Sequence, residues 1–205
     1  MRISYAIPVC NEDKELDRLL AQLLFHETSN MEVVVQCDQG NTSPEVYRVL
    51  DKYSAFIRVI EFPLKGNFAA FKNNLKKHCT GAWIFQIDAD EYLSDNLIKN
   101  LPAILQSNPT ADLLLVPRIN TVEGLTQAHI QKWGWNVNQQ GWVNFPDYQW
   151  RIYKNDPKIK WINKVHERLE GFNTISNLPS SEEYCLYHPK TIDRQEKQNN
   201  YYNTL

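Results

Sequence analysis

The chain has 205 residues and a formal net charge of -2 at pH 7. That length suffices for one substantial core and only marginally for two, and the near-neutral charge gives no electrostatic reason to expect nucleic acid or an anionic membrane as the main partner. The N-terminus has no basic segment followed by an apolar one, and no apolar run is long enough to span a membrane. We therefore expect a single domain over residues 1–205, no transmembrane segment, no nucleic-acid partner and a cytoplasmic location.

The cysteines are widely spaced and form neither CxxC pairs nor a zinc pattern; they are Cys10, Cys37, Cys79 and Cys185. Three of them lie within or at the ends of apolar runs, which favours buried free thiols in a reducing compartment. The pattern leaves the oligomeric state open.

The first half of the chain alternates between short apolar runs and helical patterns. Strands are predicted at residues 2–9, 32–37, 56–62 and from 83, and helices between them, where leucines, valines and alanines recur at helical spacing. This alternation predicts an α/β fold with a mostly parallel sheet and helices on both faces. Ligands bind such sheets at the carboxyl ends of the strands. Three polar segments follow strands and are expected to meet there: residues 8–12, 38–43 and 88–91.

The second half is less regular. Residues 97–105 predict a helix and residues 112–116 a strand, whereas residues 119–148 show no clear period and predict loops and short strands over the sheet's edge. Short strands are expected at residues 150–153, 161–169 and 184–187, the last ending at His188, and the tail at residues 191–202 has helical propensity.

The segment Trp83–Glu91 predicts a buried strand that ends in the carboxylates Asp88, Asp90 and Glu91. Like charges at this spacing are tolerated when a cation or a proton relieves their repulsion, and a divalent metal would also leave positions open for a phosphate. The alternative is an acidic helix start, with Asp90, Glu91 and Ser94 favouring the N-terminus of the next helix.

Several ordered motifs resemble those of family 2 glycosyltransferases. They are Ile7-Pro8-Val9-Cys10-Asn11-Glu12, Asp38-Gln39-Gly40-Asn41-Thr42-Ser43, Gly66 followed by Phe71-Lys72-Asn73, Asp88-Ala89-Asp90, residues 145–155, and Trp161 followed by Val165-His166-Glu167. The resemblance covers nearly the whole chain. Gln39 and Ser43 replace acidic residues of the family pattern, and Lys72 replaces an arginine and lacks its bidentate fork.

The resemblance implies a GT-A fold with a nucleotide-binding half, about residues 1–118, and an acceptor and catalytic half, about residues 119–205. It also implies metal-dependent transfer of a sugar from a nucleoside-diphosphate sugar, with UDP ahead of TDP and GDP, to a hydroxyl of a carbohydrate or glycan acceptor. Asp90 and His188 are the metal ligands that it suggests, for Mn²⁺ or Mg²⁺; imidazole suits Mn²⁺ better than Mg²⁺. The residues expected to bind the nucleotide and donor are Pro8, Cys10, Asn11, Glu12, Asp38, Lys65, Lys72, Asp88 and Ala89.

Glu167 is the candidate general base, because alternation along a strand would point it away from His166 and Arg168. A base in this role implies an inverting reaction. The alternative for Glu167 is an exposed residue paired with Arg168 or Lys164. Asp147 is the reserve base. Lys76 would add positive charge near the phosphates or belong to a solvated basic face, and Arg151 and Lys190 are weaker phosphate ligands. Trp133, Trp135 and Trp142 are expected to form a stacking platform for the acceptor or to pack in the core.

Two other functions stay open. A sugar-nucleotide nucleotidylyltransferase would share the α/β sheet and the metal, but it needs a glycine-rich loop after the first strand, and residues 8–12 contain no glycine. A non-catalytic carbohydrate- or nucleotide-binding module would keep the fold without turnover. A dinucleotide oxidoreductase is disfavoured, because no GxGxxG follows the first strand.

Overall fold

The first half of the chain forms the predicted alternation of strands and helices. The computed structural model describes residues 1–26 and 30–202. Its first elements are β1 (Ile3–Val9), α1 (Asp13–Phe25), β2 (Met31–Asp38), α2 (Pro44–Lys52), β3 (Arg58–Phe62), α3 (Phe68–Lys77) and β4 (Trp83–Gln86). Side chains that accept a backbone N–H begin two of these helices: Ser43 accepts from Val46 and Asn67 from Ala70.

The second half adds long antiparallel strands to this unit. Its elements are β5 (Tyr92–Leu93), α4 (Asp95–Ser107), β6 (Leu113–Glu123), α5 (Gln127–Trp133), β7 (Val143–Lys154), β8 (Lys160–Ile162), β9 (Arg168–Glu170), β10 (Ile175–Asn177), the 3₁₀ turn η1 (Glu182–Tyr184), β11 (Leu186–Thr191) and α6 (Ile192–Tyr202). Ser94 caps α4, as the helix-start interpretation of this segment predicted.

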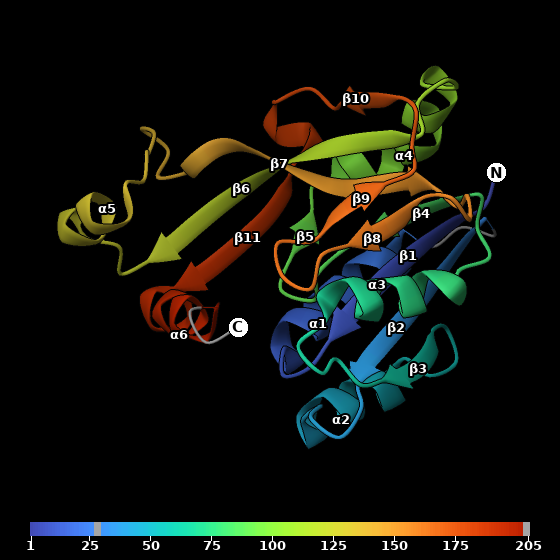
Figure 1. Ribbon diagram of the computed structural model, residues 1–205, viewed down its shortest axis with the longest axis horizontal. Coiled ribbons are helices and arrows are strands. Elements are labelled where there is room, and N and C mark those ends of the chain that lie inside the picture. Colours follow the sequence, from blue (N-terminus) through green and yellow to red (C-terminus); the bar gives the residue numbers. More distant parts are fainter. Residues whose placement is uncertain (27–29, 203–205) are drawn as a thin grey trace.

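One nine-stranded sheet joins both halves in the order β3-β2-β1-β4-β7-β6-β11-β5, with β10 beside β6 (Figure 1). The pairs among β1, β2, β3 and β4 are parallel, as are β6 with β10 and with β11. Strand β7 is antiparallel to both β4 and β6, and β5 is antiparallel to β11. The sheet is therefore mostly parallel, and the predicted α/β class is confirmed.

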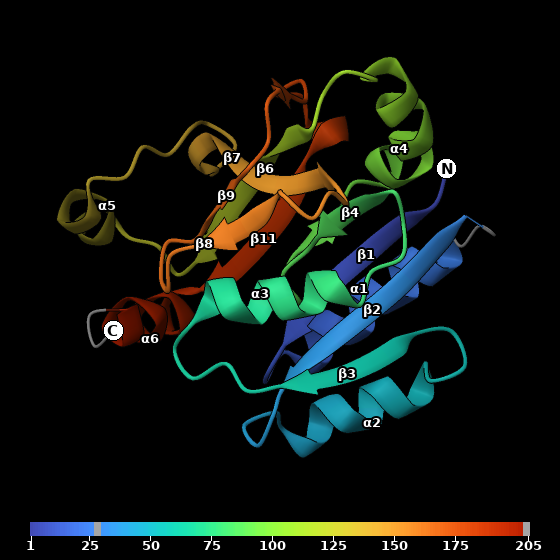
Figure 2. The same ribbon diagram turned by 45° about the vertical axis from the view of Figure 1, so that its right-hand side comes forward.

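Alternating side chains divide the core into two layers. Tyr5 and Ile7 pack with α1, α2 and α4 on one face, whereas Ala6 and Val34 pack with α3 and the small β8–β9 sheet on the other. Figure 2 shows α3 in front of the sheet and α1 behind it. Strands covered on both faces read as continuous apolar runs, which is why the sequence identified them.

The structure corrects the prediction of loops for residues 119–148. Strand β6 continues to Glu123 and β7 begins at Val143, and between them lie α5 and the connecting turns. The extensions are only half buried and carry polar residues such as Asn120 and Gln149, because they border a cavity and not the core. Periodicity weakens where neither face of a strand is fully buried.

Two further strand assignments change. Residues 161–169 are not one strand: β8 and β9 form a hairpin, and left-handed backbone at Asn163 (φ 71°) and His166 (φ 53°) turns the chain between them. Glu167 therefore lies in a turn, and the alternation argument for its direction was wrong. His188 lies within β11 opposite Asn120, and not at the end of a strand. Across the described residues, no helix is both long and apolar enough to cross a membrane.

Candidate active site

A cavity of about 550 Å³ opens at the carboxyl ends of β1, β2 and β4, where the sequence placed the site. The polar segments after these strands meet there: the backbone N–H of Ser43 donates to the Cys10 carbonyl at 3.0 Å. Most predicted site residues line the cavity: Pro8, Cys10, Glu12, Asp38, Lys72, Asp88, Ala89, Asp90, Glu167 and His188. Asn11 and Lys65 are exposed and lie outside its lining.

Two carboxylates organise the loops at the β1 and β2 side of the cavity. Glu12 Oε2 accepts the backbone N–H groups of Cys10 at 2.9 Å and of Asn11 at 3.0 Å. Asp38 Oδ1 accepts the N–H of Leu64 at 2.8 Å, and its Oδ2 accepts Asn41 Nδ2 at 3.1 Å. Burial and the nearby charges of Glu12 and Asp38 raise the pKa of the Cys10 thiol to about 11, so this cysteine is a neutral wall residue and not a nucleophile.

Two arginines, one buried (Arg151) and one partly buried (Arg118), relieve the repulsion among the carboxylates that follow β4. Glu91 is fully buried and accepts Arg118 Nη1 at 2.9 Å and Arg151 Nη2 at 2.7 Å. Arg151 Nη2 also donates to Asp88 Oδ2 at 2.5 Å. A divalent metal is therefore not required to explain Asp88 and Glu91. The sequence suggested Arg151 only as a weak phosphate ligand, but its side chain is buried, with 3% of the residue exposed, and it binds these carboxylates.

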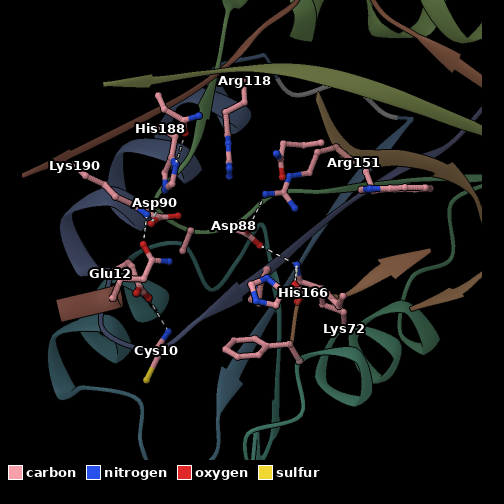
Figure 3. A pocket seen from close by; sticks show the side chains of 18 of the residues that line it. Cys10, Glu12, Lys72, Asp88, Asp90, Arg118, Arg151, His166, His188 and Lys190 are labelled. Carbon is pink, nitrogen blue, oxygen red and sulfur yellow. Dashed lines mark hydrogen bonds and ion pairs between the residues drawn. The ribbon is translucent and has the colours of Figure 1, made fainter. Parts of the chain in front are cut away.

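The charges in this cluster fix one another's protonation. Burial alone would raise the pKa of Asp88, but the positive charges of Arg151 and Lys72 outweigh it and hold that pKa below its ordinary value. Burial would likewise lower the pKa of Arg151, and Asp88 and Glu91 raise it instead. Asp88 thus stays ionised, and Figure 3 shows it between Arg151 and Lys72.

A chain of hydrogen bonds sets the direction of His188. Asn120 Nδ2 donates to Asp147 Oδ2 at 2.8 Å, so Asn120 Oδ1 is the atom that faces His188 Nδ1, at 2.9 Å. An amide oxygen can only accept, and Nδ1 must therefore carry the hydrogen. In a neutral ring, Nε2 then directs its lone pair toward Asp90 Oδ2, which is 3.1 Å away.

This donor pair fits a divalent cation. A lone pair facing a carboxylate is repulsive unless a proton or a metal lies between them, and a fixed Nδ1–H is the usual support of a metal-binding imidazole. Burial raises the pKa of Asp90, but a proton on His188 Nε2, which takes the place of a metal between the two side chains, lowers it to about 2 through its hydrogen bond and charge. Within residues 1–26 and 30–202, no group of three or more His, Cys, Asp or Glu side chains could hold a metal, so the protein offers two donors here.

Glu167 is positioned by Lys72 and not by its neighbours in sequence. Lys72 Nζ donates to Glu167 Oε1 at 2.6 Å, lies 3.6 Å from Asp88 Oδ1 and sits 4.7 Å from the centre of the Trp161 ring. Arg168 and Lys164, the partners of the alternative interpretation, make no such contact in the part of the chain that is described. The reserve base Asp147 is occupied, since it accepts Arg118, Asn120 and Gln149.

Of the other basic candidates, Lys190 lines the cavity and Lys76 does not. Lys76 Nζ donates to the carbonyl of Asp156 at 2.8 Å and is not among the cavity-lining residues. Lys190 lines the cavity, and burial lowers its pKa to about 8 in spite of the nearby charge of Asp90. Arg194 on α6, which sequence reasoning did not select, donates to Glu15 at 2.6 Å and lies 3.3 Å from Asp90 Oδ2.

Aromatic side chains form the wall near β7. Trp135 and Trp150 line the cavity, and the Trp133 ring lies 4.6 Å from that of Trp135. Trp142 contacts Phe145 at 4.8 Å between ring centres. Trp133, Trp135 and Trp142 are all half-buried, so none of them is a core residue.

An α/β sheet with carboxylates and fixed cations around a cavity at the carboxyl ends of its parallel strands is typical of nucleotide-binding proteins. The sequence pattern described as Glycosyl transferase family 2 matches residues 4–175. The chain belongs to that family, and its fold is the GT-A fold that the motifs predicted.

Solved structures of TarS from S. aureus share this fold. The complex of TarS 1-349 with UDP-GlcNAc is 20% identical with a TM-score of 0.63, covering 93% of this chain and 59% of that one. The crystal structure of S. aureus TarS is 19% identical with a TM-score of 0.64, covering 92% of this chain and 37% of that one. At this identity the likeness shows the fold alone.

A relative by sequence is the uncharacterized protein y4gI of Sinorhizobium fredii, strain NBRC 101917 / NGR234. It is 28% identical over 149 residues, which are 70% of this chain and 16% of that protein. The chain thus spans less than two thirds of the length of each of these proteins.

Proposed function

We propose that this domain transfers a sugar from a nucleoside-diphosphate sugar, with UDP as the nucleotide, to a hydroxyl of a carbohydrate acceptor. The observation that carries the proposal is that one cavity holds two separate groups of side chains, one suited to a metal and one suited to a base. Asp90 and His188 lie on one side of Asp88, and Lys72, which holds Glu167, lies on the other (Figure 3). Family membership and the fold shared with a UDP-GlcNAc-bound protein support the choice of donor.

Each part of this arrangement has a task in glycosyl transfer. Glu12 and Asp38 hold the loops that would bind the nucleoside, because they fix backbone groups at the mouth of the cavity. Asp88, kept ionised by Arg151, would orient the ribose or the donor sugar. A Mn²⁺ or Mg²⁺ ion held by Asp90 and His188 would neutralise the departing diphosphate.

Glu167 would take the proton from the acceptor hydroxyl. Its contact with Lys72 orients the carboxylate. As Glu167 takes the proton, the acceptor oxygen would bond to the anomeric carbon on the face opposite the nucleoside diphosphate, whose bond to that carbon breaks, so the configuration inverts. Trp135 and Trp150 offer flat apolar faces for the acceptor sugar in the same cavity.

The first test is donor hydrolysis, since transferases usually release some donor to water. UDP-, TDP- and GDP-sugars are incubated with Mn²⁺, Mg²⁺ or EDTA and wild type, Asp90→Ala, or Asp51→Ala as the control. Asp51 is an exposed residue of α2. We expect metal-dependent release of one nucleoside diphosphate by wild type and by the control, and none by Asp90→Ala.

Two outcomes would contradict the proposal. Absence of release with every donor, together with nucleotide binding that EDTA does not change, would indicate a non-catalytic binding module. Consumption of a nucleoside triphosphate with a sugar phosphate would indicate a nucleotidylyltransferase. A transfer product of unchanged anomeric configuration, seen by NMR, would contradict inversion and the role of Glu167 alone.

A further inference from the structure

The first turn of the C-terminal helix α6 brings a guanidinium into the carboxylate group at the cavity. Arg194 Nη1 donates to Glu15 Oε1 at 2.6 Å, and Nη2 lies 3.5 Å from Glu12 Oε1 and 3.3 Å from Asp90 Oδ2. Asp90 Oδ2 is also the oxygen that faces His188 Nε2. Arg194 thus supplies positive charge at the oxygen that would bind a metal.

A guanidinium and a divalent cation would compete for this oxygen. Two cations a few ångströms apart repel each other strongly where water is partly excluded, and only 17% of the Asp90 side chain and 32% of the Arg194 side chain are exposed. The binding of a metal to Asp90 would therefore weaken the contact of Asp90 with Arg194, and that contact would weaken metal binding.

The helix that carries Arg194 is attached to the protein mainly through its surface. No side chain between residues 192 and 199 is fully buried, so α6 contributes little to the apolar core. Hydrogen bonds between side chains attach it to the rest of the protein, among them those of Arg194 with Glu15 and of Gln198 with Lys190. Gln195, Gln198 and Lys190 line the cavity, so a small movement of α6 keeps its inner face beside a bound donor.

Building on the proposed function, we propose that Arg194 exchanges partners during the reaction cycle. In the empty enzyme it is the counter-ion of Asp90, and when a metal takes that carboxylate it moves to the diphosphate of the donor. The planar fork of arginine matches phosphate oxygens as well as carboxylate oxygens. Arg194 is then a donor-binding residue, and its contact with Asp90 lowers metal affinity until a donor arrives.

The test measures the two affinities separately. Isothermal titration calorimetry with Mn²⁺ alone, and then with UDP at saturating Mn²⁺, is run on wild type, Arg194→Ala and Arg194→Lys. Asp90→Ala shows which Mn²⁺ heat belongs to this site, and Arg48→Ala, on the exposed face of α2 at 73% exposure, controls for loss of one positive charge elsewhere.

Opposite shifts are the expected result. Arg194→Ala should bind Mn²⁺ roughly tenfold more tightly, because a repelling charge is gone, and UDP roughly tenfold more weakly. Arg194→Lys should keep Mn²⁺ affinity near that of wild type and recover part of the UDP affinity. Arg48→Ala should match wild type in both.

Other results would overturn the exchange. If Arg194→Ala weakens Mn²⁺ and UDP binding together, Arg194 only supports the structure of the site. If Mn²⁺ affinity does not change, the two cations do not compete. A wild type that binds UDP no better than Arg194→Ala overturns this inference alone, whereas a wild type that binds no nucleoside diphosphate overturns the proposed function as well.

Discussion

Two clusters built around carboxylates lie at opposite ends of the parallel strands β1, β2 and β4. Their carboxylates have different kinds of hydrogen-bond donor. At the amino end, Glu32 Oε1 accepts Ser4 Oγ, the N–H and hydroxyl of Thr80, and the N–H of Gly81 at 3.1 Å. At the carboxyl end, Asp88 and Glu91 are neutralised by the side chains of Arg118 and Arg151.

The difference between the clusters is one of rigidity. Two of the four donors to Glu32 Oε1 are backbone N–H groups, and a Cβ at Gly81 would lie 2.7 Å from Ser4 N, so packing keeps the amino-end cluster closed. Long cationic side chains beside a cavity can change partners. The amino-end cluster therefore serves stability, and the carboxyl-end cluster has the properties of a binding site.

Among substitutions that distinguish the two ends of the strands, Glu167→Gln at the cavity should have the largest effect, a fall in kcat. Loss of a positioned base lowers kcat on the order of 10²–10⁴-fold, while UDP affinity at saturating Mn²⁺ stays close to that of wild type. Initial transfer rates and calorimetry measure the two quantities. Glu170→Gln is the matched control: it lies in the same hairpin, its side chain is 46% exposed, and its ion-pair partner is Lys160. A fall in kcat of less than fivefold would require a different base.

Glu91→Gln should destabilise the protein by roughly 3–5 kcal/mol, because it leaves the buried Arg151 and the partly buried Arg118 with one negative charge fewer. Urea unfolding of the variant against Glu170→Gln measures the change in the free energy of unfolding. A loss below about 1 kcal/mol would mean that water or Asp88 replaces Glu91 as the partner of both arginines at little cost, and that Glu91 contributes little to the stability of this cluster.

The sequence predicted the first half of the fold, and most of the site residues that it suggested line the cavity. Strands covered on both faces give continuous apolar runs, and polar segments at their carboxyl ends must meet at one edge of the sheet. Asp38, Asp88 and Asp90 were found in this way, and each lines the cavity.

The parts that were missed depend on contacts between distant residues. Arg151 looked like a surface residue, since a buried charge is recognisable only together with Glu91, which lies 60 positions away in the chain. Arg194 and Asp90 are 104 positions apart, and nothing in the local pattern of the polar tail indicates their contact. The direction of Glu167 depends on left-handed backbone at His166, a non-glycine residue that seldom adopts it.

Asn120→Ala should weaken Mn²⁺ binding by roughly 10- to 100-fold, although the variant keeps both Asp90 and His188. Without the Asn120 oxygen, the Nδ1–H of His188 loses the acceptor that directs Nε2 toward Asp90. Calorimetry with Mn²⁺ measures the affinity, with Asn100→Ala on the exposed face of α4 as the control. An unchanged affinity would show that His188 does not bind the metal.

The smallest effect should come from Glu32→Gln, which removes charge-assisted hydrogen bonds but keeps the shape of the side chain. We expect a loss of about 1–3 kcal/mol in the free energy of unfolding and no change in kcat.

Burial would raise the pKa of Glu32, but hydrogen bonds from Ser4, Thr80 and Gly81 outweigh it and lower that pKa. Its contribution is therefore present above the unfolded pKa near 4.5 and is lost as the pH falls through the lower folded value. Glu32→Gln should then flatten the acid side of the stability profile, measured by urea unfolding between pH 3 and 7, without changing the pH dependence of activity. A shift in the activity profile would connect the two ends of the sheet and contradict their separation.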